Sequence, residues 1–279
     1  MISPSLTSGY GNNIFITGGS SGIGLACARL FAQNGYHVYA ASRNPQKETL
    51  NFDGGGQIHP IAMDVCNAQS VKNVLTELLT EVDIGIVLHS AGLGIACPAE
   101  CFPADSVNML MDTNFSAILH LNSHFFPHFR KRECGLCVMI SSVASIFAIP
   151  FQSHYCASKS ALESYAEALR MEVSDYNIKV ALVLPGDTHT GFTSARSFHI
   201  DEASPYYKAC TESVAKMEKD ELAGASPDCV AKVIFRLSFK KNPPLRTIVG
   251  AEYKIFALLK RILPYGLVEF ILKKLYLGG

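Results

Sequence analysis

The chain has 279 residues, with 24 basic and 24 acidic side chains, so its formal net charge is zero. This balance argues against a protein that binds nucleic acid electrostatically, because such binding needs an excess of basic residues. The nine cysteines are scattered and odd in number, which indicates reduced thiols rather than a disulfide framework. The first five residues lack the basic and apolar regions of a signal peptide, so we expect a cytoplasmic protein.

Short apolar runs alternate with helical patterns along most of the chain. We expect strands at residues 14–17, 37–41, 58–63, 84–89, 136–141, 179–184 and 246–249. Strands that alternate with helices in this way predict an α/β fold with a doubly wound, seven-stranded parallel sheet. No repeat or low-complexity linker interrupts the pattern, so we expect a single domain over residues 1–279.

A glycine-rich turn follows the first expected strand. It reads Thr17-Gly18-Gly19-Ser20-Ser21-Gly22-Ile23-Gly24 and leads into a helical pattern over residues 25–31. Glycines at a strand-to-helix turn permit a tight bend and the close approach of a dinucleotide pyrophosphate to the helix N-terminus. Such turns also occur without a ligand, so the motif on its own leaves both interpretations open.

The end of the second expected strand indicates which dinucleotide would bind. A fold specific for NAD usually places a carboxylate there, about 20 residues beyond the glycines, to hold the ribose hydroxyls. This chain has Ser42-Arg43 and no carboxylate at that point. The planar guanidinium of Arg43 suits a 2′-phosphate, which predicts NADP(H); a solvated surface charge is the alternative.

Two polar residues interrupt apolar segments in the middle of the chain. Asn114 lies inside a mostly apolar helical stretch, and a buried Asn needs hydrogen-bond partners, so it suggests a polar relay. Ser142 directly follows the expected strand 136–141. Ligands of open parallel sheets bind beyond the carboxyl ends of the strands, so Ser142 should face a crevice. A helix N-cap is the alternative for this serine.

Tyr155 and Lys159 stand four residues apart, a spacing that places both side chains on one face of a helix. An unperturbed tyrosine has a pKa of about 10. A nearby cation favours the phenolate and lowers this pKa, which would make Tyr155 a usable general acid or base.

Together these motifs resemble the classical short-chain dehydrogenase/reductase family, and in particular its hydroxysteroid and retinol dehydrogenase-type members. The resemblance covers residues 12 to about 250 and adds the motif Pro185-Gly186-x-x-x-Thr190. It departs from the family at His89-Ser90-Ala91-Gly92, where Asn-Asn-Ala-Gly is usual. His89 itself reads as a strand-end residue with a local partner. Cys134 and Cys137 have a metal-like spacing but no second pair, so we expect no metal site.

The resemblance implies a catalytic set of Asn114, Ser142, Tyr155 and Lys159. Tyr155 would exchange the proton, Ser142 would hold the substrate oxygen, Lys159 would lower the pKa of Tyr155 and hold a ribose, and Asn114 would anchor a water relay. It also implies a set of cofactor contacts: Gly18, Ser20, Ser21, Gly22, Ile23, Gly24, Ser42, Arg43, Asp64, Val65, Ala91, Gly92, Asn114, Tyr155, Lys159, Pro185, Gly186, Thr188 and Thr190.

The implied function is an NADP(H)-dependent oxidoreductase that interconverts a hydrophobic ketone and a secondary alcohol, with a steroid-, retinoid- or lipid-like substrate. Two alternatives stay open. One is a reductase of 3-oxoacyl chains on a carrier protein, and the other is a non-enzymatic NADP(H)-binding regulator.

Residues 186–226 show no clear strand or core pattern and correspond to the substrate lid of the family. Their aromatic residues Phe192, Phe198, Tyr206 and Tyr207 either line an apolar pocket or only pin the lid to the body.

The C-terminal residues 251–279 form two apolar, lysine-punctuated stretches broken by Pro264 and Gly266. Neither stretch reaches the roughly 20 apolar residues that span a bilayer. We expect an amphipathic helical tail that covers the substrate mouth or packs against another subunit of a homo-oligomer. Peripheral contact with a membrane interface is the alternative.

Overall fold

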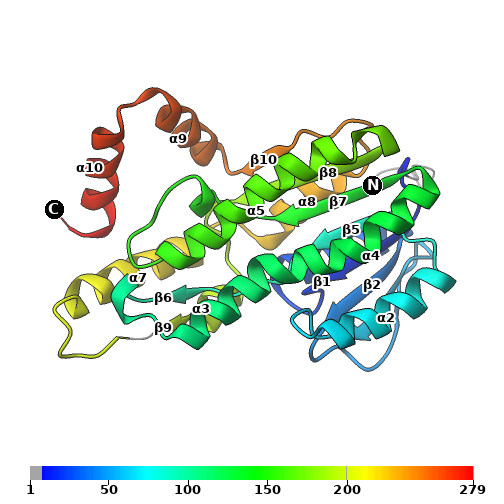
Figure 1. The fold of residues 1–279 in the computed structure, drawn as a ribbon, viewed down its shortest axis with the longest axis horizontal. Helices are drawn as coiled ribbons and strands as arrows, with labels where there is room; N and C mark the ends of the chain where they lie inside the picture. The colour runs from blue at the N-terminus through cyan, green and yellow to red at the C-terminus, as the bar shows by residue number, and fades with distance from the viewer. Residues whose placement is uncertain (1–7, 199, 279) are drawn as a thin grey trace.

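The computed structural model describes residues 8–198 and 200–278. Its centre is an eight-stranded sheet with the order β10-β8-β7-β5-β1-β2-β4-β3 (Figure 1). The strands of this sheet are β1 (Asn13–Thr17), β2 (His37–Ser42), β3 (Leu50–Asn51), β4 (Gln57–Ala62), β5 (Ile86–His89), β7 (Gly135–Ile140), β8 (Ile178–Pro185) and β10 (Arg246–Val249).

The seven expected strands are confirmed, and they pair with one another in parallel. The eighth strand, β3, was not predicted. It comprises only two residues at the sheet edge and runs antiparallel to β4. Two residues are too short for an alternation of apolar and polar side chains, which is why the sequence pattern misses this strand.

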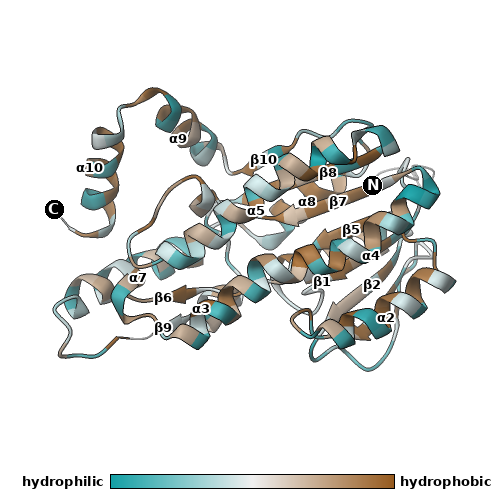
Figure 2. Ribbon diagram, viewed as in Figure 1, coloured by the Kyte–Doolittle hydropathy of each residue, from teal (hydrophilic) through white to brown (hydrophobic). Residues whose placement is uncertain are grey.

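Two helical layers cover the sheet. One face carries α1 (Gly22–Gln33) and α8 (Pro227–Leu237), where the rings of Phe31 and Phe235 pack edge to face at 5.0 Å. The other carries α2 (Ala68–Glu81), α4 (Ala117–Arg132) and α5 (Ser153–Glu172). All six residues of β7 are buried between the layers, and the strands form the brown centre of Figure 2. Burial on both faces explains why these strands read as continuous apolar runs.

The sheet order reverses at β1, which lies between β2 and β5. The connections that follow β1 and its neighbour therefore run to opposite sides of the sheet order, and the carboxyl ends of these strands leave a crevice between them. In open α/β sheets this crevice is where ligands bind.

The segment expected as an irregular lid contains regular structure. It comprises α6 (Phe192–Ala195), β9 (Ser197–Phe198) and α7 (Tyr207–Ala223), and β9 pairs with β6 (Ile95–Ala96). The prediction of a segment without a core pattern was therefore wrong for α7. Its buried face is Cys210, Ser213, Val214 and Met217, which keeps helical spacing but has too little apolar character to be recognised.

The remaining helices are α3 (Ala104–Met111), near the β6–β9 pair, and two C-terminal helices, α9 (Ala251–Ile262) and α10 (Tyr265–Tyr276). The last two form the predicted helical tail and lie to one side of the body, in orange and red in Figure 1. No helix within residues 8–198 and 200–278 is long and apolar enough to cross a membrane.

Candidate active site

A cavity of about 660 Å³ lies at the carboxyl ends of the central strands. It gathers most of the residues predicted from the sequence: Gly18, Ser20, Ser21, Gly22, Ile23, Ser42, Arg43, Asp64, Val65, Ala91, Gly92, Ser142, Tyr155, Lys159, Pro185, Gly186, Thr188 and Thr190. Two predicted residues, Gly24 and Asn114, are absent from its lining.

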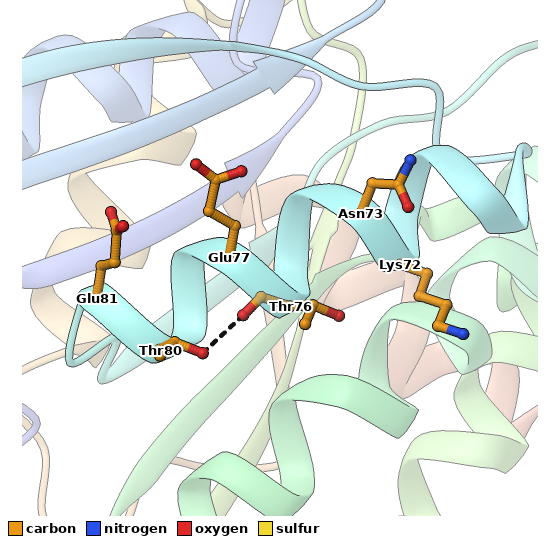
Figure 3. A pocket seen from close by; sticks show the side chains of 6 residues that line it. All are labelled: Lys72, Asn73, Thr76, Glu77, Thr80 and Glu81. Carbon is orange, nitrogen blue, oxygen red and sulfur yellow. Dashed lines mark hydrogen bonds between the residues drawn. The ribbon is translucent and has the colours of Figure 1, made fainter.

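A second hollow of about 520 Å³ lies along α2. Figure 3 shows its six lining side chains, which are Lys72, Asn73, Thr76, Glu77, Thr80 and Glu81. All six come from a single helix, and the dashed line marks the hydrogen bond that Thr80 Oγ1 donates to the Thr76 carbonyl over 2.8 Å. No second element supplies convergent groups here, so this hollow is the polar outer surface of a helix rather than a site.

The glycine-rich turn shapes one wall of the cavity. Gly18 has φ +67°, and a Cβ atom at this position would lie 2.9 Å from the backbone nitrogen of Ala91. A Cβ atom on Gly24 would lie 2.2 Å from the Gly18 carbonyl, so Gly24 allows α1 to pack on the turn instead of touching a cofactor. The N-cap residue Ser21 makes no side-chain hydrogen bond to α1. The first amides of this helix are therefore available to a pyrophosphate.

Arg43 is exposed at the rim of the cavity, beyond the end of β2. Beside it, the buried Ser42 Oγ has no hydrogen-bond partner within the described residues. A buried hydroxyl without a partner is costly, and a ligand oxygen at this point would satisfy it. These two residues therefore fit a ribose 2′-phosphate. Asp64 has a local role as well, since its Oδ1 accepts a hydrogen bond from Cys66 N over 3.0 Å.

Asn114 is completely buried in a π-helical turn, Asp112–Ser116, between α3 and α4. Its amide exchanges hydrogen bonds of 2.9 and 3.0 Å with the backbone of Leu93 and donates to Ser158 Oγ over 3.1 Å. Such π-turns are frequent at functional sites. The Asn114 side chain thus holds the loop after β5 against α5, and its hydrogen-bonding capacity is mostly used by these protein groups.

Tyr155 and Lys159 lie on α5 and face the cavity, with the ammonium 5.8 Å from the centre of the phenol ring. Lys159 is buried and donates to the Ile140 carbonyl over 2.9 Å. Burial lowers the pKa of Lys159 to about 8. Burial also raises the pKa of Tyr155 to about 12, although a hydrogen bond with Ser142 opposes this shift.

The predicted lowering of the Tyr155 pKa by Lys159 is therefore wrong for this structure. Removing the phenol from water disfavours the phenolate, and the groups that oppose this shift are Ser142 and Arg196 rather than Lys159.

Ser142 combines the two roles that the sequence left open. It is the N-cap of a short 3₁₀ turn, where its Oγ accepts a hydrogen bond from Ala144 N over 3.1 Å, and it also lines the cavity.

One wall of the cavity contains polar residues that the sequence did not indicate. Arg196 is buried and donates through Nη2 to Glu221, which also accepts from Thr193 Oγ1 over 2.6 Å. The Nε and Nη1 atoms of Arg196 have no partner within the described residues. Asp187 accepts from the Tyr253 hydroxyl, and burial raises the pKa of its carboxyl group. The acceptor Glu221 and the donor Tyr253 are distant in sequence from Arg196 and Asp187, so no local motif indicates these pairs.

Of the four aromatic lid residues, Phe192 alone lines the cavity, with its ring 5.8 Å from that of Tyr155. Phe198 and Tyr206 are exposed, and the Tyr206 hydroxyl donates to Glu100 over 3.5 Å. These residues, like the half-buried Tyr207, are absent from the lining. The tail contributes Tyr276 of α10 instead, so part of it covers the cavity.

The unusual residues His89 and Cys134 have structural surroundings. His89 is buried, with Nε2 2.8 Å from Asn122 Oδ1, and burial lowers its pKa to about 4, so it stays neutral near pH 7. Cys134 Sγ donates to the Gly9 carbonyl over 3.4 Å, and Cys137 is buried. Within residues 8–198 and 200–278 no group of three or more His, Cys, Asp or Glu side chains could hold a metal ion.

Comparison with known proteins places this architecture. The family model described as "short chain dehydrogenase" matches residues 12–200. A 3-ketodihydrosphingosine reductase of Bacteroides thetaiotaomicron is 34% identical, over 94% of this chain and 97% of the relative. Retinol dehydrogenase 8 of Bos taurus is 31% identical, over 91% and 86% of the two chains. Among solved structures, a short-chain dehydrogenase from Streptomyces avermitilis matches with a TM-score of 0.78, 22% identity and 95% coverage of each chain.

Proposed function

The chain belongs to the short chain dehydrogenase family and is an oxidoreductase of alcohol or carbonyl groups, and we propose that it reduces a hydrophobic, lipid-like ketone with NADPH. The observation that carries this proposal is the convergence of Ser142, Tyr155 and Lys159 on one cavity beside the glycine-rich turn. Hydroxyl, phenol and ammonium groups have no shared structural reason to meet there, whereas carbonyl reduction requires all three functions.

NADP(H) supplies or accepts the hydride in this reaction. The amides at the start of α1 hold its pyrophosphate, and Ser42 and Arg43 hold its 2′-phosphate. Lys159 holds a ribose and contributes positive charge close to Tyr155. The Ser42 Oγ, which has no partner within the described residues, supports this assignment.

Tyr155 donates a proton from its hydroxyl to the substrate oxygen. Ser142 donates a hydrogen bond to the same oxygen and stabilises the charge that develops on it. Asn114 acts indirectly, because it fixes the Leu93 loop and Ser158 and thereby the position of α5. Phe192 excludes water from the phenol.

Tyr155 is protonated at neutral pH, because burial raises its pKa to about 12, and a proton donor to the substrate oxygen must be protonated.

The substrate is proposed to be a long-chain ketone with a polar end. The printed name of the relative from Bacteroides thetaiotaomicron, a 3-ketodihydrosphingosine reductase, supports this class. Arg196 offers two nitrogens without a partner among the described residues, Nε and Nη1, to an acceptor on the substrate, and Phe192 and Tyr276 supply apolar surface. A carrier-bound substrate has less support. It would need a basic patch at the mouth of the cavity to dock the carrier, and Lys216 in this region is paired with Asp220 at 2.6 Å.

The test is a turnover assay with a panel of ketones and both nicotinamide cofactors. We expect NADPH consumption with long-chain 3-keto lipids and much weaker consumption with short, water-soluble ketones. Tight cofactor binding without turnover of any ketone would favour a regulator, and turnover of carrier-bound 3-oxoacyl chains alone would favour that alternative.

A further inference from the structure

Helix α9 contacts the body along one face only. On the inner face, Tyr253 donates a hydrogen bond to Asp187, and Lys260 Nζ donates to the Ile146 carbonyl. The opposite face carries Ile255, Leu258, Leu259 and Ile262 at helical spacing, between 41% and 70% exposed. An apolar stripe directed away from a face that is already packed contributes nothing to holding the helix on the body.

Helix α10 repeats this arrangement. Val268 is buried on its inner face, and Tyr276 packs beside the cluster that contains Cys210 and Met217 of α7. The outward face carries Leu267, Phe270 and Ile271, and the exposed Leu275 flanks it. We call the eight residues on the two helices the outward stripe: Ile255, Leu258, Leu259, Ile262, Leu267, Phe270, Ile271 and Leu275. Figure 1 shows both helices at the margin of the molecule.

Basic side chains accompany the outward stripe. Residues 251–278 contain five basic and two acidic residues, although the whole chain is neutral. Lys273 pairs with Glu269 at 2.8 Å. Lys254, Arg261 and Lys274 are exposed, and none of them makes an ion pair within the described residues. The stripe therefore combines apolar area with an excess of positive charge.

We propose that the outward stripe docks the protein on an anionic lipid surface, with α9 and α10 lying in the headgroup region. Helices with an apolar face and flanking Lys or Arg residues bind such interfaces through buried apolar area and attraction to anionic lipids. A second copy of this chain is a poorer occupant. In a two-fold dimer the stripe would face its own copy and bring the basic residues of both chains together.

The location of the tail indicates what contact with lipid would do for catalysis. This role rests on the proposed function. Tyr276, at the end of α10, lines the cavity, so the docked helices join the lipid phase to the active site. A long-chain ketone could then pass from the bilayer to Tyr155 without crossing water, where exposure of its chain would be unfavourable.

The test is flotation of the full chain with vesicles of phosphatidylcholine alone or mixed with phosphatidylserine. We expect binding to the mixed vesicles and its loss in the triple variant Leu258→Ser, Ile262→Ser, Phe270→Ser. The matched control is Met171→Ser with Leu222→Ser, which removes exposed apolar residues from the body and should bind like the wild type. Lys254→Glu, Arg261→Glu and Lys274→Glu together should weaken binding at least about a hundred-fold, since each basic residue contributes a factor of about five.

The proposal is overturned if the wild type does not float, or if the triple variant floats equally well. It is also overturned if sedimentation shows an oligomer that the triple variant dissociates, since a second copy would then cover the stripe. Reduction of a water-soluble ketone should be unchanged in the triple variant. Loss of flotation with this activity retained therefore separates the docking proposal from the proposed function.

Discussion

The body of this protein buries most of its large apolar side chains, whereas the C-terminal tail exposes most of its own. Among the described residues, the body up to residue 250 exposes six large apolar side chains, and the much shorter tail exposes eleven. In the body, apolar residues pack between the sheet and its helices and hold the catalytic groups in place. In the tail, Val268 is buried against the body, whereas most of the large apolar side chains are exposed and available to a partner. Apolar residues at helical spacing can therefore form either a core or an interface, and only the structure distinguishes these two cases.

The largest effect is expected in the body, from Tyr155→Phe. Without the proton donor, turnover should fall by about two to four orders of magnitude, the range for general acid–base catalysis. NADPH affinity should change little, because the ring is retained. Steady-state kinetics combined with a fluorescence titration of NADPH measures both quantities, and near-normal turnover would remove Tyr155 from the mechanism.

Core packing in the body gives the next largest effect. Phe125 is fully buried, with its ring 5.2 Å from that of Phe15. Phe125→Ala should lower the free energy of unfolding by about 3–5 kcal/mol, since it leaves a cavity. Denaturant unfolding monitored by circular dichroism checks this value. A loss below about 1 kcal/mol would mean that this layer is less tightly packed than the structure indicates.

Cofactor preference should respond to Arg43→Ala. Loss of a charge-assisted contact with the 2′-phosphate is worth about 1.5–3 kcal/mol, which corresponds to about a ten- to hundred-fold loss of NADPH affinity. NADH affinity should stay the same, because NADH has no 2′-phosphate. Titration of both cofactors against both proteins gives the answer. An unchanged ratio of the two affinities would show that Arg43 is only a solvated surface charge.

The pH dependence should reveal Lys159. Burial lowers its pKa to about 8, so the side chain is positively charged below this pH and loses its charge as the pH rises through it. We expect kcat/KM for NADPH to decrease above pH 8, by up to about ten-fold per pH unit for one essential proton. Lys159→Arg should shift the decrease to higher pH, because the guanidinium stays charged. A profile that is flat to pH 10 would contradict this role.

The smallest effect is expected in the tail, from Ile262→Ser. This side chain is 70% exposed, so the free energy of unfolding should change by less than about 0.5 kcal/mol. The unfolding assay used for Phe125→Ala provides the direct contrast. A loss comparable with that of Phe125→Ala would mean that the outward stripe is already packed against protein in solution.

The sequence predicted what depends on residue types at fixed local spacing. The Tyr155–Lys159 pair and the glycine-rich turn are each recognisable within a segment of at most eight residues. The seven parallel strands are recognisable as continuous apolar runs. The structure brings most of these predicted site residues to one cavity. Gly24 is the exception in the turn, because its lack of a side chain serves helix packing.

The features of the site that the sequence did not predict depend on contacts between distant segments. Arg196 and Glu221 meet across the lid, and Tyr276 reaches the cavity from the end of the chain. The predicted shift of the Tyr155 pKa had the wrong direction, because the burial of this residue cannot be predicted from a motif. The predicted homo-oligomer and the membrane interface remain predictions, since both concern surfaces that partners would cover.

The most direct test of the central claim is a single-turnover reaction with NADPH that carries deuterium at the transferable hydride position. Excess enzyme would be mixed with the labelled cofactor and a long-chain 3-keto lipid, and the products analysed by mass spectrometry. We predict a secondary alcohol with one deuterium on the former carbonyl carbon, formed by the wild type and not by Tyr155→Phe on the same timescale. Cofactor that binds but never transfers its label to a ketone would contradict the account.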